Sequence, residues 1–235
     1  MAKTLKRFYK QVEIRQLEGN KQYEILLDGR ALKTPMKQAC LAPTKGLAEA
    51  IQQEWQSQEE DIILDDMIMT KLLNTAHDRV ALRRDELIDE LVRYANNDLL
   101  CYWADYPTAL IEQQEQAWRP ILNHMRDVHG LSFTVQQGIM HQDQAEETLF
   151  GVRQMIEPLD AYRLTAFHNI VTSVSSVMLG LRAVFDGEDV DVVWSLSRID
   201  EEFQIKQWGS DEEAEKKTAL LKRDLDNAYG FLRLL

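Results

Sequence analysis

The residues of this chain that could carry out chemistry do not form a catalytic motif. The sequence lacks GxxxxGK[ST] and GxGxxG, so it lacks the glycine spacing with which backbone N–H groups cradle phosphate. It also lacks the zinc motif HExxH and the nucleophile elbow GxSxG. Carboxylates occur in adjacent pairs, such as Glu59-Glu60, but such pairs in an acidic chain indicate a solvated surface. Residue chemistry therefore favours a binding or scaffolding protein over an enzyme, and we expect no nucleotide or other cofactor.

The histidines and cysteines do not have the spacing of a metal-ligand set. His124 and His129 are five residues apart, about 500° around a helix, so we expect them to face different directions. His168 is interpreted as a core histidine, with a role as ligand or base as the alternative. Cys40 and Cys101 are isolated, which predicts reduced thiols. We expect no metal site.

The chain is acidic, with 27 Lys and Arg against 39 Asp and Glu, for a net charge of −12. It has no basic stripe for nucleic acid and no polybasic membrane anchor. Residues 164–181 carry no charge, but their polar side chains and helical apolar stripe predict a buried core helix instead of a membrane span. We expect no nucleic-acid partner and no membrane insertion. The N-terminal residues resemble neither a signal peptide nor a presequence, which predicts a bacterial cytoplasmic protein or an already trimmed organellar one.

The histidines, cysteines and carboxylates discussed above are distributed over two regions of the chain that differ in hydrophobic periodicity. The first contains strand-like alternation near Val12 and Ile14 and again over 23–27, followed by the hairpin signal Asp28-Gly29. Thr44 is expected to cap a helix near 44–57. From about residue 70 the apolar period is that of helices. The sequence therefore predicts an α+β fold, with a small β-rich N-terminal domain (1–68) and a larger, mostly α-helical C-terminal domain (69–235).

The C-terminal domain is expected to be helical nearly throughout. Further helices are predicted through 107–129, 144–157, 159–185, 189–207 and 211–233, with a short strand at 131–135. Three stripes are expected to be buried: Leu87/Leu91/Tyr94, Val174/Val177/Leu181 and Val192/Leu196/Ile199/Phe203. Glu201 should point away from the last stripe. Gly209 should end one helix, and Ser210 with Glu213 should form the capping box of the next.

Seven sequence blocks resemble, in order, one known family. The blocks are RFYK (7–10), LDGRALKTP (27–35), LAPT (41–44), EWQSQ (54–58), LNTAHD (73–78), YANNDLLCY (94–102) and QIKQWGSDEEA (204–214). They are similar to the assembly chaperones of the F-type ATP synthase, which escort the α subunit of the catalytic head. The match runs from about residue 7 to 214, with little contribution from 104–160. The resemblance implies no ATP hydrolysis, no cofactor, and a protein that binds unassembled α subunit and hands it to the β subunit.

The resemblance also indicates where the partner binds. The functional acidic position of the family falls in or near residues 200–202, so Asp200, Glu201 and Glu202 are candidates, with a solvated acidic face as the alternative. Asp211 is a further candidate for partner binding. Another group is interpreted as structural or partner-facing: Trp55, Asn74, Asp78, Gln204 and Trp208.

For the residues interpreted as structural or partner-facing, the expected role follows from their places in the predicted helices. Trp55 shares a helical stripe with Leu47 and Ile51, which favours interior packing. Asn74 and Asp78 are four residues apart and are expected to anchor a loop or interdomain hydrogen bonds. Trp208 is expected to serve in capping and packing.

Two functions remain in competition. The first is the assembly chaperone, which would cover the apolar interface that an unassembled ring subunit exposes. The alternative is a small-molecule hydrolase with a pocket between the domains. Converging carboxylates in a well-formed apolar pocket would favour the hydrolase, whereas an open groove with exposed apolar residues and an acidic rim would favour the chaperone.

Overall fold

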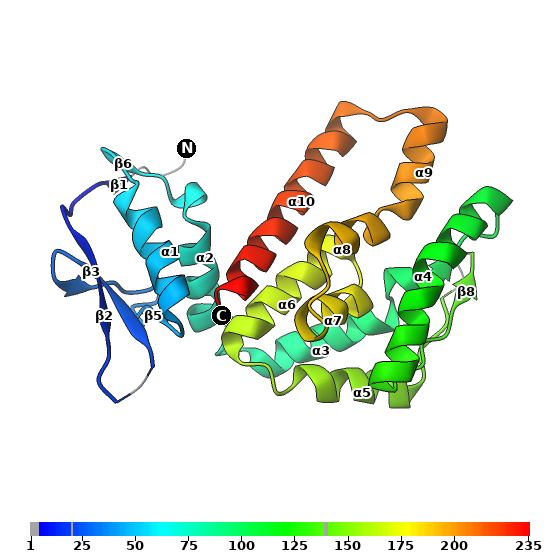
Figure 1. Cartoon of the computed structure of the whole chain (residues 1–235), viewed down its shortest axis with the longest axis horizontal. Coiled ribbons are helices and arrows are strands. Elements are labelled where there is room, and N and C mark those ends of the chain that lie inside the picture. Colours follow the sequence, from blue (N-terminus) through cyan, green and yellow to red (C-terminus); the bar gives the residue numbers. More distant parts are fainter. Residues whose placement is uncertain (1–4, 20, 139–140) are drawn as a thin grey trace. The chain divides into compact units, whose positions relative to one another are not determined.

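The computed structural model describes residues 5–19, 21–138 and 141–235, which fall into two compact units (Figure 1). The first unit comprises the chain up to Arg84 together with Asp160–Ala166 and Gly230–Leu235. The second comprises Asp85–Leu159 and Phe167–Tyr229. A strand-rich N-terminal region is thus followed by a helical one, which confirms the α+β class. The first unit extends beyond the expected boundary at residue 68 because the helix that follows packs against the helix before it.

The first unit is built around an antiparallel sheet. Its central strand, β3 (Tyr23–Leu27), pairs with β2 (Val12–Gln16), β4 (Arg30–Ala31) and β5 (Leu41–Ala42). Asp28 and Gly29 join β3 to β4 with φ of 48° and 75°, which confirms the predicted hairpin because a tight primed turn needs positive φ at both positions. A separate antiparallel pair joins β1 (Leu5–Lys6) to β6 (Asp61–Ile62).

Helix α1 (Lys45–Gln56) packs against β2 and β3 (Figure 1). The Thr44 hydroxyl accepts a hydrogen bond from the Leu47 N–H at 3.2 Å, so the helix begins as predicted. The 3₁₀ turn η1 (Leu64–Asp66) leads into α2 (Ile68–Thr75), which continues as the π-helical turn η2 (Ala76–Val80). The core of this unit also includes Ala166 and the C-terminal Phe231, both fully buried.

The second unit is almost entirely helical. Its elements are α3 (Arg84–Asn96), η3 (Leu99–Cys101), α4 (Thr108–His129), α5 (Glu146–Ile156), α6 (Ala161–Val174), α7 (Val177–Phe185), α8 (Val190–Ser197), α9 (Ile199–Trp208) and α10 (Glu212–Arg233); α6 and α10 each extend into the first unit. Parallel strands β7 (Tyr102–Trp103) and β8 (Gln136–Gln137) complete it. The strand predicted at 131–135 is wrong, because the Gln144 side chain bonds both the N–H and the carbonyl of Thr134 in place of a neighbouring strand.

The single helix predicted over 159–185 is two helices. Ser175 has a φ of 54°, which ends α6, and the Ser176 hydroxyl caps α7 by accepting the Leu179 N–H at 3.1 Å. The predicted core stripe is nevertheless confirmed, since Val174, Val177 and Leu181 are all at most 2% exposed. Within the described residues, no helix is long and apolar enough to cross a membrane.

The helix predicted over 189–207 is also divided, because Arg198 leaves helical geometry between α8 and α9. Because of this break, the buried residues of α8 and α9 do not follow one helical stripe: Val193 is buried in α8, whereas the predicted Val192 is 42% exposed. Phe203 is buried as predicted. The stripe predicted in α3 is confirmed in part, because Leu91 is buried whereas Leu87 and Tyr94 are only partly buried beside the fully buried Ile88 and Ala95.

Candidate functional site

The acidic block Asp200–Glu202 occupies the first turn of α9, and its three side chains have different environments. Asp200 is half-buried, and its carboxylate accepts a hydrogen bond from Gln114 Nε2 of α4 at 2.6 Å. Burial raises the pKa of the Asp200 carboxyl, and the charge of Glu201 adds to this, while the Gln114 bond acts in the opposite direction. Gln114 is itself 1% exposed and accepts the Ala104 N–H at 2.8 Å. Asp200 therefore joins α9 to α4.

Glu201 is partly buried, which differs from the outward orientation expected from the sequence. One carboxylate oxygen accepts a bond from Arg198 Nη1 at 2.9 Å. The other oxygen is buried and has no hydrogen-bond partner among the described residues. The break before α9 turns Glu201 toward Arg198, whereas Glu202, one residue further around the helix, is exposed.

Glu201 and Arg198 line a pocket of about 440 Å³ within the second unit. The remaining lining residues come from η3, the end of α6, α8 and the start of α10: Leu99, Thr172, Ser173, Val174, Ser175, Ser197, Ala214, Lys217, Thr218 and Leu221. Of these described lining residues, Glu201 is the sole acid, and Arg198 and Lys217 are the cations. The pocket therefore does not offer the pair of converging carboxylates that an acid–base hydrolase would use.

The end of α9 is exposed, so the packing role predicted for Trp208 is wrong. Trp208 is 79% exposed, and Ile205, three residues earlier, is 43% exposed. Phe203 is the buried residue of α9, and the residues that follow it in this helix are all exposed. Gln204 is exposed as well. Exposure of Ile205 is not expected from the sequence, because an isoleucine in a helix is normally a core residue.

Asp211 has an intramolecular role at the start of α10. Its carboxylate accepts the N–H groups of Glu213 at 2.9 Å and Ala214 at 3.0 Å, so Asp211 caps the helix. The capping box predicted for Ser210 and Glu213 is therefore wrong, since the Ser210 hydroxyl bonds Glu215 instead.

The candidates in the first unit, Trp55, Asn74 and Asp78, make contacts within the chain. Trp55 is 6% exposed and packs edge-on against Tyr9, with ring centroids 5.5 Å apart. Asp78 accepts the Thr34 hydroxyl at 2.6 Å and the Met36 N–H at 3.0 Å, so it anchors the loop that follows β4. Asn74 Oδ1 lies 3.9 Å from the Cys40 thiol.

Large apolar side chains that are exposed together, as Trp208 and Ile205 are, are typical of a surface that binds another protein. The family model described as ATP12 chaperone protein matches residues 6–126, and the chain belongs to this family. This result confirms the resemblance noted from the seven sequence blocks.

Known relatives agree with this assignment. The crystal structure of Atp12 from Paracoccus denitrificans is 36% identical and has a TM-score of 0.93, with 97% of each chain covered. The Atu1473 protein of Agrobacterium tumefaciens is 32% identical with a TM-score of 0.91, covering 98% of this chain and 86% of the other. The mitochondrial protein atp12 of Schizosaccharomyces pombe is 24% identical over 223 residues, 90% of this chain and 76% of that protein. The family is named for chaperones, which favours the chaperone over the hydrolase.

Proposed function

We propose that this protein is an ATP-independent assembly chaperone that binds the unassembled α subunit of the F-type ATP synthase catalytic head. It prevents aggregation of that subunit and hands it to the β subunit. Membership of the ATP12 chaperone family supports the class of function. The main observation in favour of a binding surface on α9 is the exposure of Trp208. Ile205, three residues earlier, is also exposed and lies on the same side of this helix.

The chemistry of this surface suits an apolar partner interface. An unassembled ring subunit exposes the apolar area that its neighbour will cover, and such patches cause aggregation. Tryptophan contributes strongly to protein interfaces because one side chain buries a large apolar area with little loss of conformational freedom. Trp208 and Ile205 would supply such contacts, and an acidic rim of exposed carboxylates would orient a basic partner: Glu202, Glu212 and Glu213.

The four acidic candidates differ in how accessible their carboxylates are to a partner. Glu202 is fully available to a partner, and Glu201 is partly available. Asp200 and Asp211 hold α9 and α10 in place through Gln114 and the helix cap, so they support the surface and do not form it.

Binding and release need no ATP in this mechanism. A stoichiometric binder that covers the exposed interface lowers the free concentration of the aggregation-prone subunit by mass action. Release follows when the β subunit binds the same surface more tightly. We place this activity where the catalytic head is assembled, in the bacterial cytoplasm, or in the mitochondrial matrix for an organellar form.

The test is light scattering of denatured α subunit diluted into excess chaperone. Trp208→Ala should protect the α subunit less than the parent, while its melting temperature stays within about 2 °C because Trp208 is exposed. The matched control is Phe150→Ala, which removes another exposed aromatic of the second unit, 63% exposed on α5. If the parent and Trp208→Ala protect the α subunit equally, α9 is not part of the binding surface. Failure of the parent itself to suppress scattering would contradict the proposed function.

A further inference from the structure

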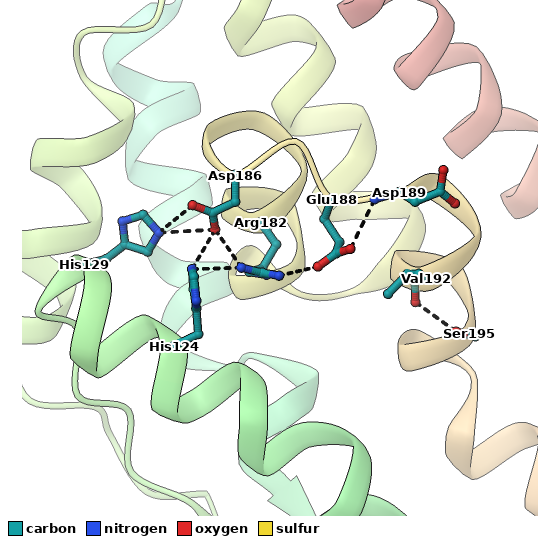
Figure 2. Close-up of polar contacts among 8 residues, drawn as sticks. All are labelled: His124, His129, Arg182, Asp186, Glu188, Asp189, Val192 and Ser195. Carbon is teal, nitrogen blue, oxygen red and sulfur yellow. Dashed lines mark hydrogen bonds and ion pairs between the residues drawn. The ribbon is translucent and has the colours of Figure 1, made fainter.

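Four polar side chains from α4, from α7 and from the residue after α7 converge on one point in the second unit (Figure 2). His124 and His129 lie in the last two turns of α4, Arg182 lies in α7, and Asp186 follows α7 directly. The two imidazole rings, expected from their spacing to face different directions, have centroids only 5.4 Å apart. They meet because His129 is the last residue of α4 and both rings bend toward the Asp186 carboxylate (Figure 2).

We propose that His124, His129 and Asp186 form a binding site for Zn²⁺ or a chemically similar late first-row divalent ion. His124 Nε2 lies 3.0 Å from Asp186 Oδ2, and His129 Nε2 lies 3.2 Å from Oδ1 and 3.3 Å from Oδ2. Ligand atoms at about 2.0–2.1 Å from a tetrahedral Zn²⁺ are roughly 3.3 Å from one another. One ligand atom from each of the three residues lies within 4.8 Å of the other two. The three ligands therefore already have nearly the separation that the ion requires.

The hydrogen bonds of the cluster are not mutually compatible without an ion. His124 Nε2 lies 2.8 Å from Arg182 Nη1 and also 3.0 Å from Asp186 Oδ2. If Nε2 is unprotonated, it can accept a hydrogen bond from the guanidinium, but its lone pair then repels the carboxylate oxygen. If Nε2 is protonated, it can donate to the carboxylate, but its N–H group then repels the N–H groups of the guanidinium. One of the two contacts is therefore unfavourable in either protonation state. A divalent ion resolves the conflict, because it binds the lone pair of Nε2 and the carboxylate together.

Arg182 occupies the position of the cation in the ion-free cluster. Its Nη1 lies 3.2 Å from Asp186 Oδ2, its Nη2 pairs with Glu188, and its Nε is buried without a partner among the described residues. With neutral imidazoles, Asp186 and Glu188 against Arg182 leave one negative charge in excess. When the ion binds, the Nε2 lone pair of His124 goes to the ion, so Arg182 gives up its bonds to both His124 and Asp186 and retains Glu188.

The donor set determines the class of ion. Two imidazole nitrogens and one carboxylate oxygen suit Zn²⁺ and its neighbours, whereas Mg²⁺ and Ca²⁺ prefer sites made of oxygen alone. Three protein ligands leave a fourth position for water. The ion would join the end of α4 to the turn that leads from α7 to α8, and would stabilise the folded chain because an unfolded chain does not hold the three groups together.

The first experiment uses the full chain, freed of metal with a chelator and titrated with Co²⁺ as a spectroscopic substitute for Zn²⁺. We expect intense visible d–d bands of a tetrahedral site at one Co²⁺ per chain, which disappear when Zn²⁺ is added. Calorimetry with ZnCl₂ should give one site with a Kd at or below about 10 µM, and zinc should raise the melting temperature. A featureless Co²⁺ spectrum together with no saturable zinc binding would overturn the proposal, and this test requires no mutant to fold.

Variants then assign the ligands. His124→Asn and His129→Asn should each weaken zinc binding about tenfold or more with an unchanged circular dichroism spectrum. The matched control, His141→Asn, changes an exposed histidine that pairs with Asp143 and should bind zinc like the parent. Arg182→Gln should bind zinc more tightly, because the competing cation is removed. Undiminished one-to-one zinc binding in the double variant His124→Asn/His129→Asn would place the ion elsewhere and overturn the proposal.

Discussion

The carboxylate of Asp98 accepts a hydrogen bond from the backbone N–H of Met178 at 3.0 Å, which joins residues 80 positions apart. Its other oxygen accepts the Leu100 N–H at 3.0 Å. One side chain thus caps η3 and also bonds the first turn of α7. Asp98 is fully buried, and this burial raises the pKa of its carboxyl to about 6 although the hydrogen bonds act to lower it.

We predict that the contribution of Asp98 to stability decreases as the pH rises from about 4 to about 7. Its ordinary pKa is 3.8, so between that value and about 6 the folded chain binds the proton more tightly than the unfolded chain. The free energy of unfolding therefore falls with rising pH in this window, by up to roughly 3 kcal/mol. Urea unfolding of the parent and of Asp98→Asn at several pH values isolates this effect, because asparagine does not titrate.

Asp28 provides the control of opposite sign. Backbone hydrogen bonds from Gln11 and Lys10 lower the pKa of its carboxyl, so its contribution to stability should be lost as the pH falls.

The raised pKa of Asp98 would be contradicted if the difference in unfolding free energy between the parent and Asp98→Asn stayed constant from pH 4 to 7. A difference that grows in favour of the parent as the pH rises would contradict it as well.

A second prediction concerns the core of the second unit. Val174→Asp places an uncompensated carboxylate at a position that is 2% exposed and should cost about 3–5 kcal/mol. The matched control is Val192→Asp, because the sequence predicts both valines to be buried but Val192 is 42% exposed. That control should change stability by about 1 kcal/mol or less. Chemical denaturation distinguishes the two, and similar losses for both variants would show that the helical phase of α8 is wrong.

Two helical glycines should respond oppositely to alanine. A Cβ on Gly180 of α7 would lie 2.6 Å from Val171 Cγ2 and 3.0 Å from the Phe167 ring, so Gly180→Ala should destabilise by about 1–3 kcal/mol. A Cβ on Gly230 of α10 would meet only Met69 Cε at 3.7 Å, so Gly230→Ala should stabilise by about 0.5–1 kcal/mol. Thermal unfolding of both variants measures the difference. A stabilising Gly180→Ala would mean that α6 and α7 are less closely packed.

Charge reversal should separate the acidic rim from the rest of the acidic surface. Glu202→Lys should reduce protection of the α subunit because it introduces repulsion toward a basic partner. Glu147→Lys makes the same change in the first turn of α5, at another exposed position, and should protect like the parent. Glu201→Ala should reduce protection less, and should cost about 1 kcal/mol or less from loss of the Arg198 ion pair. Light scattering and melting curves measure these effects, and equal loss for Glu202→Lys and Glu147→Lys would indicate a general charge effect.

A final prediction concerns nucleotides. The missing phosphate-cradling motif and the net charge of −12 predict no binding of Mg-ATP or Mg-ADP. Calorimetry at micromolar protein should give only the heat of dilution. A saturable isotherm would contradict an ATP-independent mechanism.

Features that depend on a few consecutive residues could be predicted from the sequence. The Asp28-Gly29 hairpin follows from the tolerance of these residues for positive φ, and the start of α1 follows from the hydroxyl of Thr44. The buried stripe through Val174 and Leu181 follows from helical periodicity over a long apolar segment. The ordered sequence blocks also identified the family.

Features that depend on partners distant in the chain were decided by the tertiary structure. The chain can break at Ser175 because the Leu99 N–H bonds the freed Ser175 carbonyl and Asp98 bonds the start of α7, and neither partner is local. The break at Arg198 rotates α9, so it decides that Glu201 is partly buried and that Trp208 is exposed. The meeting of His124 and His129 depends on Asp186, which only the packing of α7 against α4 brings to them. Periodicity describes one helix at a time, and it carries no information on which distant group will satisfy a broken helix end or meet a side chain there.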